Sequence, residues 1–196
     1  DDNSIIFRID GGKIKPSKSL QDSLASMLSG NQEFIMIESQ KIIYEDIMYT
    51  VNHLKNDTQG KKVFIIKGGP GTGKSVLAIN LLSDIISEGK LAVYVTKNSA
   101  PRNVYFEKLR QGNYRKNYVH ELFKGSGSFT DSETNDFEVL LVDEAHRLNE
   151  KSGLYSNIGE NQIKEIINAA RLSVFFIDKD QRVTSKDIGT IEQIKY

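Results

Sequence analysis

Short runs of consecutive apolar residues recur along the chain and constrain its fold more than any other feature. They are Phe34–Ile37, Val63–Ile66, Leu91–Val95, Val139–Val142 and Val174–Ile177. The runs lack the alternation of apolar and polar residues that a strand with one solvated face shows, so both of their faces should be covered. Because the segments between them are long enough for helices, the pattern predicts an α/β fold, with a mostly parallel sheet and helices on both faces.

Residues with helical spacing fill the intervals between the runs. Apolar residues recur every three or four positions over Lys41–Lys55 and Val76–Ile86, and a third helix is expected over Ile163–Ala170. Gly89 stands where the second of these helices should end, because helices commonly close on a glycine in the left-handed conformation. Gly125–Asp136 has no apolar face and should be a polar loop.

The composition is that of a globular protein and excludes several classes. The chain has 196 residues, of which 38% are hydrophobic, and its 26 basic residues balance 26 acidic ones, so any nucleic-acid surface must be local. Its longest apolar run has five residues, which excludes a membrane span, and the absence of cysteine fits a cytoplasmic location. We expect an N-terminal extension over residues 1–33, partly helical, and one domain over residues 34–196. Because Asp1 stands in place of an initiator methionine, we also expect the chain to be either processed or cut from a longer polypeptide.

The strongest motif follows Val63–Ile66 directly. It reads Gly68-Gly69-Pro70-Gly71-Thr72-Gly73-Lys74-Ser75, matches G-x-x-x-x-G-K-[ST], and leads into a helix at Val76. Glycines let successive main-chain N–H groups turn toward an anion, and the helix N-terminus directs its free N–H groups at the same place. We expect this stretch to bind a nucleotide, with Lys74 bridging the β- and γ-phosphates and Ser75 ligating Mg²⁺. A glycine turn that only joins strand to helix is the weaker interpretation.

Two adjacent carboxylates, Asp143 and Glu144, follow the run Val139–Val142. In open α/β sheets, ligands bind at the carboxyl ends of the strands. Asp143 can hold Mg²⁺ there, usually through water, and Glu144 can orient or deprotonate the water that attacks a γ-phosphate. The alternative is a pair that only caps the next helix, which the upstream glycine loop makes less attractive. His146 either couples this site to other parts of the protein or forms a local hydrogen bond.

Two glutamines are further candidates for the same site. Gln181 follows Val174–Ile177 and can donate and accept at once, which suits a group that senses a γ-phosphate; the alternative is an ordinary surface turn. Gln40 lies just before Lys41–Lys55 and could read an adenine edge through its amide. An exposed, helix-capping glutamine is an equally good interpretation of Gln40.

Charge is unevenly distributed, with a basic and aromatic stretch at Lys97–Lys124. It holds seven basic residues against Glu107 and Glu121, and five aromatic rings are interleaved: Tyr105, Phe106, Tyr114, Tyr118 and Phe123. Basic groups that follow a phosphate backbone, together with rings on which bases stack, are the elements of single-strand binding. The alternative is a solvated helix whose aromatic residues face the core.

The order of these motifs resembles that of the first RecA-like domain of superfamily 1 helicases. GGPGTGKS, VYVTKNSA, VLLVDEAH and VFFIDKDQ are similar to motifs I, Ia, II and III of that domain, and Gln40 falls where its adenine-reading glutamine would. With LASMLSGNQEFIMIESQ upstream, DEAHRL and NQIKEII, the chain resembles bacterial Schlafen-type DNA/RNA helicase domains over roughly residues 17–196. The resemblance implies a RecA-like P-loop fold that binds ATP and Mg²⁺ at Lys74, Ser75, Asp143 and Glu144.

The resemblance also implies partners. Single-stranded DNA or RNA would contact the segment after the third apolar run, near Thr96, Lys97, Asn98 and Arg102. A second RecA-like domain, with its arginine fingers, is expected in the parent chain, so this half should hydrolyse ATP only slowly by itself. The family usually has glycine before the aspartate of motif III, whereas Ile177 stands there, and this leaves the placement of the γ-phosphate sensor Gln181 open.

Two other functions are compatible with a nucleotide-binding loop. An ATP-controlled switch or assembly module of the AAA+ or STAND type would use ATP to govern partner binding, with Arg171 or Arg182 serving as a finger. A small-molecule P-loop kinase is disfavoured by the DEAH run and by the lack of a distinct acceptor-binding motif.

Overall fold

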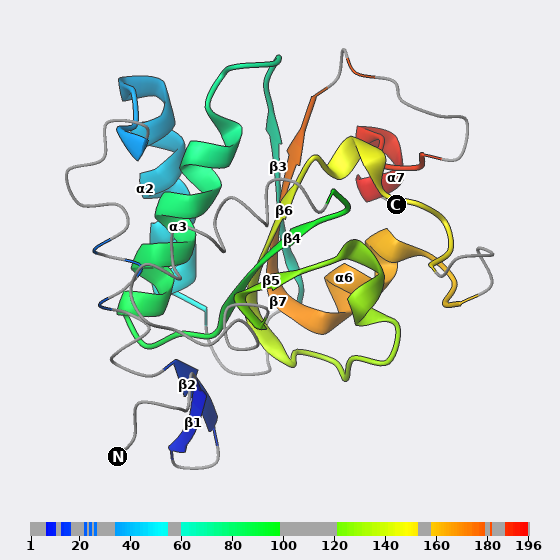
Figure 1. Cartoon of the computed structure of the whole chain (residues 1–196), viewed down its shortest axis with the longest axis horizontal. Coiled ribbons are helices and arrows are strands. Elements are labelled where there is room, and N and C mark those ends of the chain that lie inside the picture. The colour runs from blue at the N-terminus through cyan, green and yellow to red at the C-terminus, as the bar shows by residue number, and fades with distance from the viewer. Residues whose placement is uncertain are drawn as a thin grey trace.

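A computed structural model gives the architecture of the chain (Figure 1). It describes residues 7–10, 13–16, 22, 24, 26, 34–54, 60–98, 121–152, 158–178, 181 and 187–195. The elements are β1 (Phe7–Asp10), β2 (Lys13–Pro16), α2 (Glu38–Asn52), β3 (Lys62–Lys67), α3 (Lys74–Ser87), β4 (Ala92–Thr96), β5 (Phe123–Lys124), η2 (Ser126–Phe129), β6 (Phe137–Asp143), η3 (Ala145–Arg147), α6 (Gln162–Ala169), β7 (Ala170–Ile177) and α7 (Ile191–Lys195).

The centre of the molecule is a five-stranded sheet in the order β3-β7-β6-β4-β5. Every neighbouring pair in it is parallel, with Val142 opposite Phe175 and Thr96 opposite Asp143. The strands β3, β7, β6 and β4 therefore end at one edge, which we call the carboxyl edge. The predicted α/β parallel sheet is confirmed. β1 and β2 form a separate antiparallel pair that the sequence did not predict.

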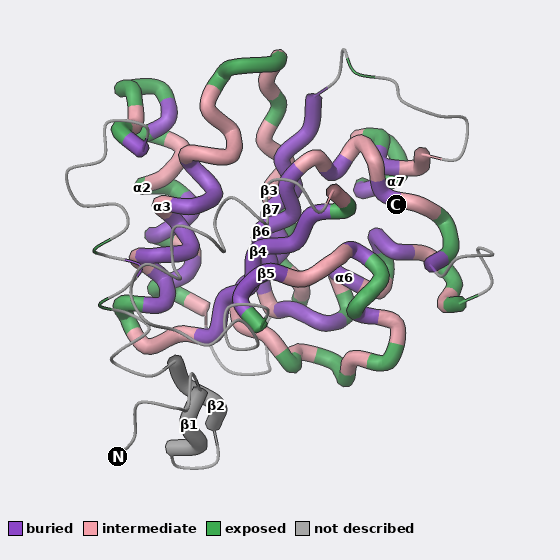
Figure 2. The backbone as a smooth tube through the Cα atoms, viewed as in Figure 1, coloured by how far each residue is buried: buried purple, intermediate pink, exposed green. Residues whose placement is uncertain are grey.

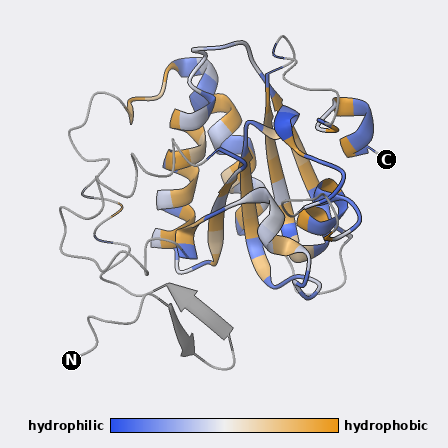
Figure 3. Cartoon of the chain, turned by 45° about the vertical axis from the view of Figure 1, so that its right-hand side comes forward, coloured by the Kyte–Doolittle hydropathy of each residue, from blue (hydrophilic) through white to orange (hydrophobic). Residues whose placement is uncertain are grey.

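Helices cover both faces of the sheet, as predicted: α2 and α3 lie on one side and α6 and α7 on the other (Figure 1). Successive residues of β7 point to opposite faces. Val174 and Phe176 pack in the cluster with α2 and α3, whereas Phe175 and Ile177 pack in the cluster with α6 and α7. This two-sided burial explains the unbroken apolar runs. The central strands are accordingly buried (Figure 2) and predominantly hydrophobic (Figure 3).

The helix α3 lies between the sheet and α2, and most of its circumference is buried. Tyr44 of α2 donates a 2.5 Å hydrogen bond to Asp84 Oδ2 of α3, and burial, together with the Asp84 carboxylate, raises the pKa of the Tyr44 phenol. The helix ends as predicted, with Gly89 at a φ of 77° donating to the Ile86 carbonyl.

The prediction of a strand over Phe34–Ile37 is wrong. Residues 35–37 are irregular, and Ile37, which caps the N-terminus of α2, is 60% exposed. Phe34 is 8% exposed, and its carbonyl accepts a hydrogen bond from Asn80 Nδ2 at 3.0 Å. Met36 packs partly buried against the same cluster. The apolar run therefore reflects an irregular, partly buried segment before α2 and not a strand.

The segment Gly125–Asp136 is irregular apart from η2, but the expectation that it lacks an apolar face is wrong. Phe129 is 1% exposed and packs edge-on against Phe137, with ring centroids 5.7 Å apart. The two-residue strand β5, just before it, was also not predicted.

Little of the N-terminal region lies within the described residues. Asp22, Leu24 and Ser26 are helical, and Leu24 is buried in the cluster of α2 and α3, which agrees with the short helix expected there. The division into residues 1–33 and 34–196 stays a prediction. None of the helices in the described part of the chain combines the length and the apolar character that a membrane span needs.

Candidate functional site

The glycine-rich stretch Gly68–Ser75, called the phosphate loop below, connects the end of β3 to the start of α3. Gly68 N donates to Ile177 O at 3.1 Å, which ties the loop to the end of β7. Gly71 and Gly73 adopt φ angles of 71° and 77°, a left-handed conformation that favours glycine. A Cβ on Gly73 would lie 2.1 Å from Gln40 Nε2, so glycine is also required there by the close approach of α2.

Gln40 is 8% exposed and contacts the phosphate loop. Its Oε1 accepts from Ile37 N at 3.0 Å, and its Nε2 donates to Thr72 O at 2.7 Å. The side chain thus caps the N-terminus of α2 and braces the loop at the same time. The capping that we considered is present, but the side chain is buried and not exposed, and a contact between Gln40 and adenine stays a prediction.

Lys74 begins α3 and turns its ammonium group back over the loop. Nζ donates to Gly68 O at 2.8 Å and to Gly69 O at 2.6 Å, and it lies 3.9 Å from Asp178 Oδ2. Its side chain is only 13% exposed. The positive charge is therefore fixed within the turn, where the N-terminus of α3 adds its own positive dipole end.

Asp143 ends β6 and meets α3 across the carboxyl edge. Its Oδ2 accepts a 2.6 Å hydrogen bond from Ser75 Oγ and another from the Tyr94 hydroxyl, and its Oδ1 accepts from Glu144 N at 2.9 Å. Asp143 is 3% exposed. The structure therefore brings Ser75 and Asp143 together, although they are 68 residues apart in the sequence.

Glu144 lies at the border of the site. Its φ of 50° places a non-glycine residue in the left-handed region, which stores backbone strain. The carboxylate is about one-third exposed and pairs with Arg147 Nη1 at 3.5 Å. Arg147 was not singled out from the sequence; its position three residues after Glu144 was the only available indication.

Asp178 and His146 form the other polar pair at this edge. Asp178 follows β7, is 3% exposed, and donates its main-chain N–H to His146 Nδ1 at 3.3 Å. Burial lowers the pKa of His146, although the Glu144 and Asp178 carboxylates oppose this. Within the described residues, His146 Nε2 is buried without a hydrogen-bond partner. The local hydrogen bond considered for His146 is thus present, and coupling stays a prediction.

The segment expected to contact nucleic acid begins at the end of β4. Thr96 is 1% exposed and its Oγ1 accepts from Asn98 N at 3.3 Å. Lys97 Nζ lies 3.0 Å from Asn149 Oδ1 and 3.2 Å from Asp187 Oδ1. The fourth predicted contact, Arg102, lies outside the described residues.

Most of the basic and aromatic stretch, including Tyr105, Phe106, Tyr114 and Tyr118, also lies outside the described part of the chain. Phe123 is described and is 1% exposed, with its ring 5.6 Å from that of Tyr94. It is therefore a core residue, and its proposed stacking on bases is wrong. Gln181 is exposed, beyond the end of β7, and its role as a γ-phosphate sensor stays a prediction.

Comparison with protein-family models agrees with this geometry. A family described as Schlafen group 3, DNA/RNA helicase domain, matches residues 61–196. The chain belongs to this family. The match includes all five strands of the sheet, the phosphate loop and Asp143, and begins after Gln40. The fold is accordingly the RecA-like α/β fold of a helicase domain. The comparison with curated proteins found no match.

The residues of this helicase domain fit a nucleotide with Mg²⁺. Mg²⁺ prefers oxygen ligands, and Ser75 Oγ and Asp143 Oδ2 lie side by side at the carboxyl edge. It commonly takes only one or two protein carboxylates and completes its shell with water and phosphate oxygens. Among the described residues, no group of three His, Cys, Asp or Glu that could hold a metal occurs. Lys74 and the N–H groups of the phosphate loop suit the phosphates.

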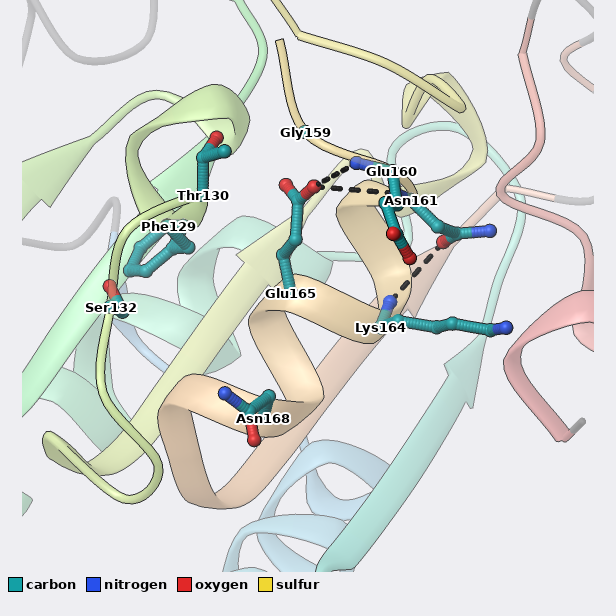
Figure 4. A pocket seen from close by; sticks show the side chains of 9 residues that line it. All are labelled: Phe129, Thr130, Ser132, Gly159, Glu160, Asn161, Lys164, Glu165 and Asn168. Carbon is teal, nitrogen blue, oxygen red and sulfur yellow. Dashed lines mark hydrogen bonds between the residues drawn. The ribbon is translucent and has the colours of Figure 1, made fainter.

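A separate pocket of about 360 Å³ opens beside α6 in the helicase domain (Figure 4). Its polar groups serve the start of that helix: Glu165 Oε1 accepts from Glu160 N at 2.8 Å, and Asn161 Oδ1 accepts from Ile163 N at 2.9 Å. The described residues that line it include none of the predicted site residues. The pocket is therefore separate from the predicted site at the carboxyl edge, which stays a prediction.

Proposed function

We propose that the chain is the ATP-binding, Mg²⁺-dependent ATPase half of a nucleic-acid helicase or translocase. The 2.6 Å hydrogen bond between Ser75 Oγ and Asp143 Oδ2 carries this proposal. Ser75 lies in α3, the helix that follows β3, whereas Asp143 ends β6, and β7 lies between β3 and β6 in the sheet. Their meeting at one edge supports a single site that holds both phosphates and metal.

Each residue of the site has a task that its contacts support. The loop N–H groups and the N-terminus of α3 bind the phosphates, and Lys74 adds a fixed ammonium. Mg²⁺, held by Ser75 and Asp143, supplies charge neutralisation on the phosphate oxygens. Glu144 orients the attacking water and accepts its proton at a carboxylate oxygen, while its Oε2 lies 3.5 Å from Arg147 Nη1.

The helicase part of the proposal rests on the family and on the edge where the strands end. Thr96 ends β4 opposite Asp143 in the register of the sheet, and Lys97 and Asn98 follow it. A strand of DNA or RNA at this place would contact residues one strand away from the proposed metal. A second RecA-like domain is the proposed partner. Arginine fingers of the kind it would supply contribute roughly 10³ to 10⁵ in rate, so we expect slow hydrolysis without it.

The Lys74→Ala variant tests nucleotide binding. It removes a charged donor aimed into the loop, and hydrogen bonds to charged groups contribute about 1.5–3 kcal/mol, so affinity for a fluorescent ATP analogue should fall roughly 10- to 150-fold. Lys90→Ala is the matched control, because Lys90 follows the other end of α3 and bonds only Glu88 and Asn52 in the described structure. Equal affinities of wild type and Lys74→Ala would overturn the proposed site.

A turnover assay separates the helicase from the switch. The full chain is joined to its proposed second domain, and ATP hydrolysis is measured with and without single-stranded DNA and RNA. Stimulation by either strand supports the proposed function. Assembly on addition of ATP, with no response to either strand, would instead favour a switch of the AAA+ or STAND type.

A further inference from the structure

Tyr94 is a fully buried tyrosine in the middle of β4 and has no place in the proposed function so far. It is 0% exposed and lies opposite Leu141 of β6 in the register. Its side chain belongs to the cluster on the α2 and α3 face, where its ring contacts Phe123. A buried phenol needs a hydrogen-bond partner, and Tyr94 donates to Asp143 Oδ2.

The two carboxylate oxygens of Asp143 are held in different ways. Oδ1 is fixed by the main-chain N–H of Glu144, whereas Oδ2 accepts from both Ser75 and Tyr94. Ser75 is on the phosphate loop, where its hydroxyl would turn to the metal. Tyr94 is enclosed by the core and cannot follow it. Its hydroxyl is therefore the contact that keeps Oδ2 in place while Ser75 changes partner.

We propose that Tyr94 is a positioning residue for Mg²⁺, whose buried hydroxyl fixes the Asp143 carboxylate in the orientation that the metal site needs. This inference rests on the proposed function, because it presumes that Asp143 serves Mg²⁺. Mg²⁺ demands near-ideal octahedral geometry, so a carboxylate that rotates freely is a poorer partner for it. Groups that orient a metal's protein partners typically change metal affinity by about 10- to 100-fold when removed.

The Tyr94→Phe variant removes one hydroxyl and keeps the ring that packs on Phe123. Affinity for a hydrolysis-resistant fluorescent ATP analogue is measured in EDTA and over a titration with Mg²⁺. We expect the Mg²⁺ concentration at half-effect to rise by roughly 10-fold or more. Affinity in EDTA should not change, because the hydroxyl that is removed donates to the Asp143 carboxylate, which in the proposed function serves the metal and not the phosphates.

Tyr44→Phe is the matched control. Tyr44 also donates its hydroxyl to an aspartate, Asp84 Oδ2 at 2.5 Å, but between α2 and α3 and away from the carboxyl edge. Both variants therefore remove a tyrosine hydroxyl that donates to an aspartate carboxylate. Its Mg²⁺ titration should be that of the wild type.

Three outcomes overturn the inference in distinguishable ways. If the wild-type chain binds the analogue and Tyr94→Phe has the wild-type Mg²⁺ titration, the inference fails and the proposed function stands. If Tyr94→Phe loses affinity equally in EDTA and in Mg²⁺, the hydroxyl supports only the fold. If the wild-type chain binds no nucleotide, the proposed function fails, and the inference with it.

A measurement on the wild-type chain keeps the inference testable if Tyr94→Phe does not fold. The hydroxyl proton of a buried tyrosine bonded to a carboxylate is observable by NMR. The Tyr94 resonance should shift when Mg²⁺ is added with nucleotide and should not shift with nucleotide alone. If the chemical shift of the Tyr94 hydroxyl proton did not change when Mg²⁺ was added with nucleotide, the inference would be overturned.

Discussion

Asp143 ends β6 and Asp178 follows the neighbouring strand β7, and each is 3% exposed, yet their surroundings differ. Asp178 lies 3.9 Å from the Lys74 ammonium. Asp143 accepts from two hydroxyls and one main-chain N–H, and within the described residues no basic side chain lies at ion-pair distance from it. One carboxylate has its counter-charge in the chain, and the other has only neutral donors.

Under the proposed function, the difference gives Asp178 a structural charge and Asp143 the charge that serves the metal. Hydrogen bonds from neutral donors lower the cost of burying a carboxylate, but they do not neutralise it. A cation at Asp143 would therefore complete a local balance that Asp178 already has. We therefore expect replacement of Asp178 to lower the free energy of unfolding more, and replacement of Asp143 to weaken the binding of Mg²⁺ more.

Replacing Asp143 with asparagine should have the largest effect on ligand binding. The Asp143→Asn variant keeps the shape, exchanges one acceptor oxygen for a donor NH₂ group and loses the charge, so Mg²⁺ should no longer tighten nucleotide binding, a loss of roughly 100-fold. Its free energy of unfolding should stay within about 1 kcal/mol of wild type, because the hydroxyls of Ser75 and Tyr94 can donate or accept. Fluorescence titration measures the nucleotide affinity, and urea denaturation measures the free energy of unfolding. If nucleotide binding by Asp143→Asn depended on Mg²⁺ as in wild type, the expected difference between the two aspartates would be wrong.

Asp178→Asn should have the opposite profile. It removes the carboxylate beside Lys74 and leaves that ammonium with main-chain carbonyls alone, so the free energy of unfolding should fall by about 1–3 kcal/mol. The half-effect concentration of Mg²⁺ should not move. Urea denaturation of the Asp178→Asn and Asp143→Asn variants provides the test. A larger loss of stability in Asp143→Asn would contradict the structural role expected for Asp178.

The smallest expected effect is on the pH dependence of the free energy of unfolding. It arises from His146, which accepts a hydrogen bond from Asp178 N. The pKa of His146 is lowered in the folded chain, chiefly by burial. Above about pH 6.5 both the folded and the unfolded state hold a neutral His146, so stability does not depend on it. As the pH falls below that value, the unfolded state takes up a proton that the folded state resists, and stability is lost until the folded pKa is passed.

His146→Gln should therefore flatten the decline of stability between pH 7 and pH 5.5, relative to wild type. His53→Gln, at the exposed end of α2, is the matched control and should keep the wild-type slope. Denaturation at a series of pH values gives the comparison. Parallel curves for wild type and His146→Gln would show that His146 does not contribute.

The strands and helices around the site could be predicted because local and tertiary preferences agree there. Val63–Ile66 and Val139–Val142 are apolar on both faces and lie in a sheet that is covered on both faces. The turn between β3 and α3 could be predicted because its motif is contiguous in the sequence, and two of its glycines, Gly71 and Gly73, adopt the positive φ angles that favour glycine. The prediction of a strand over Phe34–Ile37 was wrong because a run of four apolar residues does not distinguish a strand from a partly buried, irregular segment before a helix.

The partners of the site residues could not be predicted from the sequence. The bond between Tyr94 and Asp143 depends on the parallel register of β4 and β6 and on the ring's burial against Phe123. One indication was present, a hydroxyl in the middle of the apolar run Leu91–Val95. The pairing of Asp178 with Lys74 likewise depends on β7 lying beside β3, an order that no local pattern encodes.

The place of β7 between β3 and β6 has a consequence for how such a sequence can evolve. Neighbouring strands are about 4.8 Å apart, so β7 acts as a spacer that keeps the ends of β3 and β6 roughly 10 Å from each other. Any apolar residue of β7 can be replaced by another of similar size. Inserting or deleting one residue would turn Val174 and Phe176 to the opposite face and carry Asp178 away from Lys74. Selection should therefore tolerate drift in the identity of these residues and act strictly on their number.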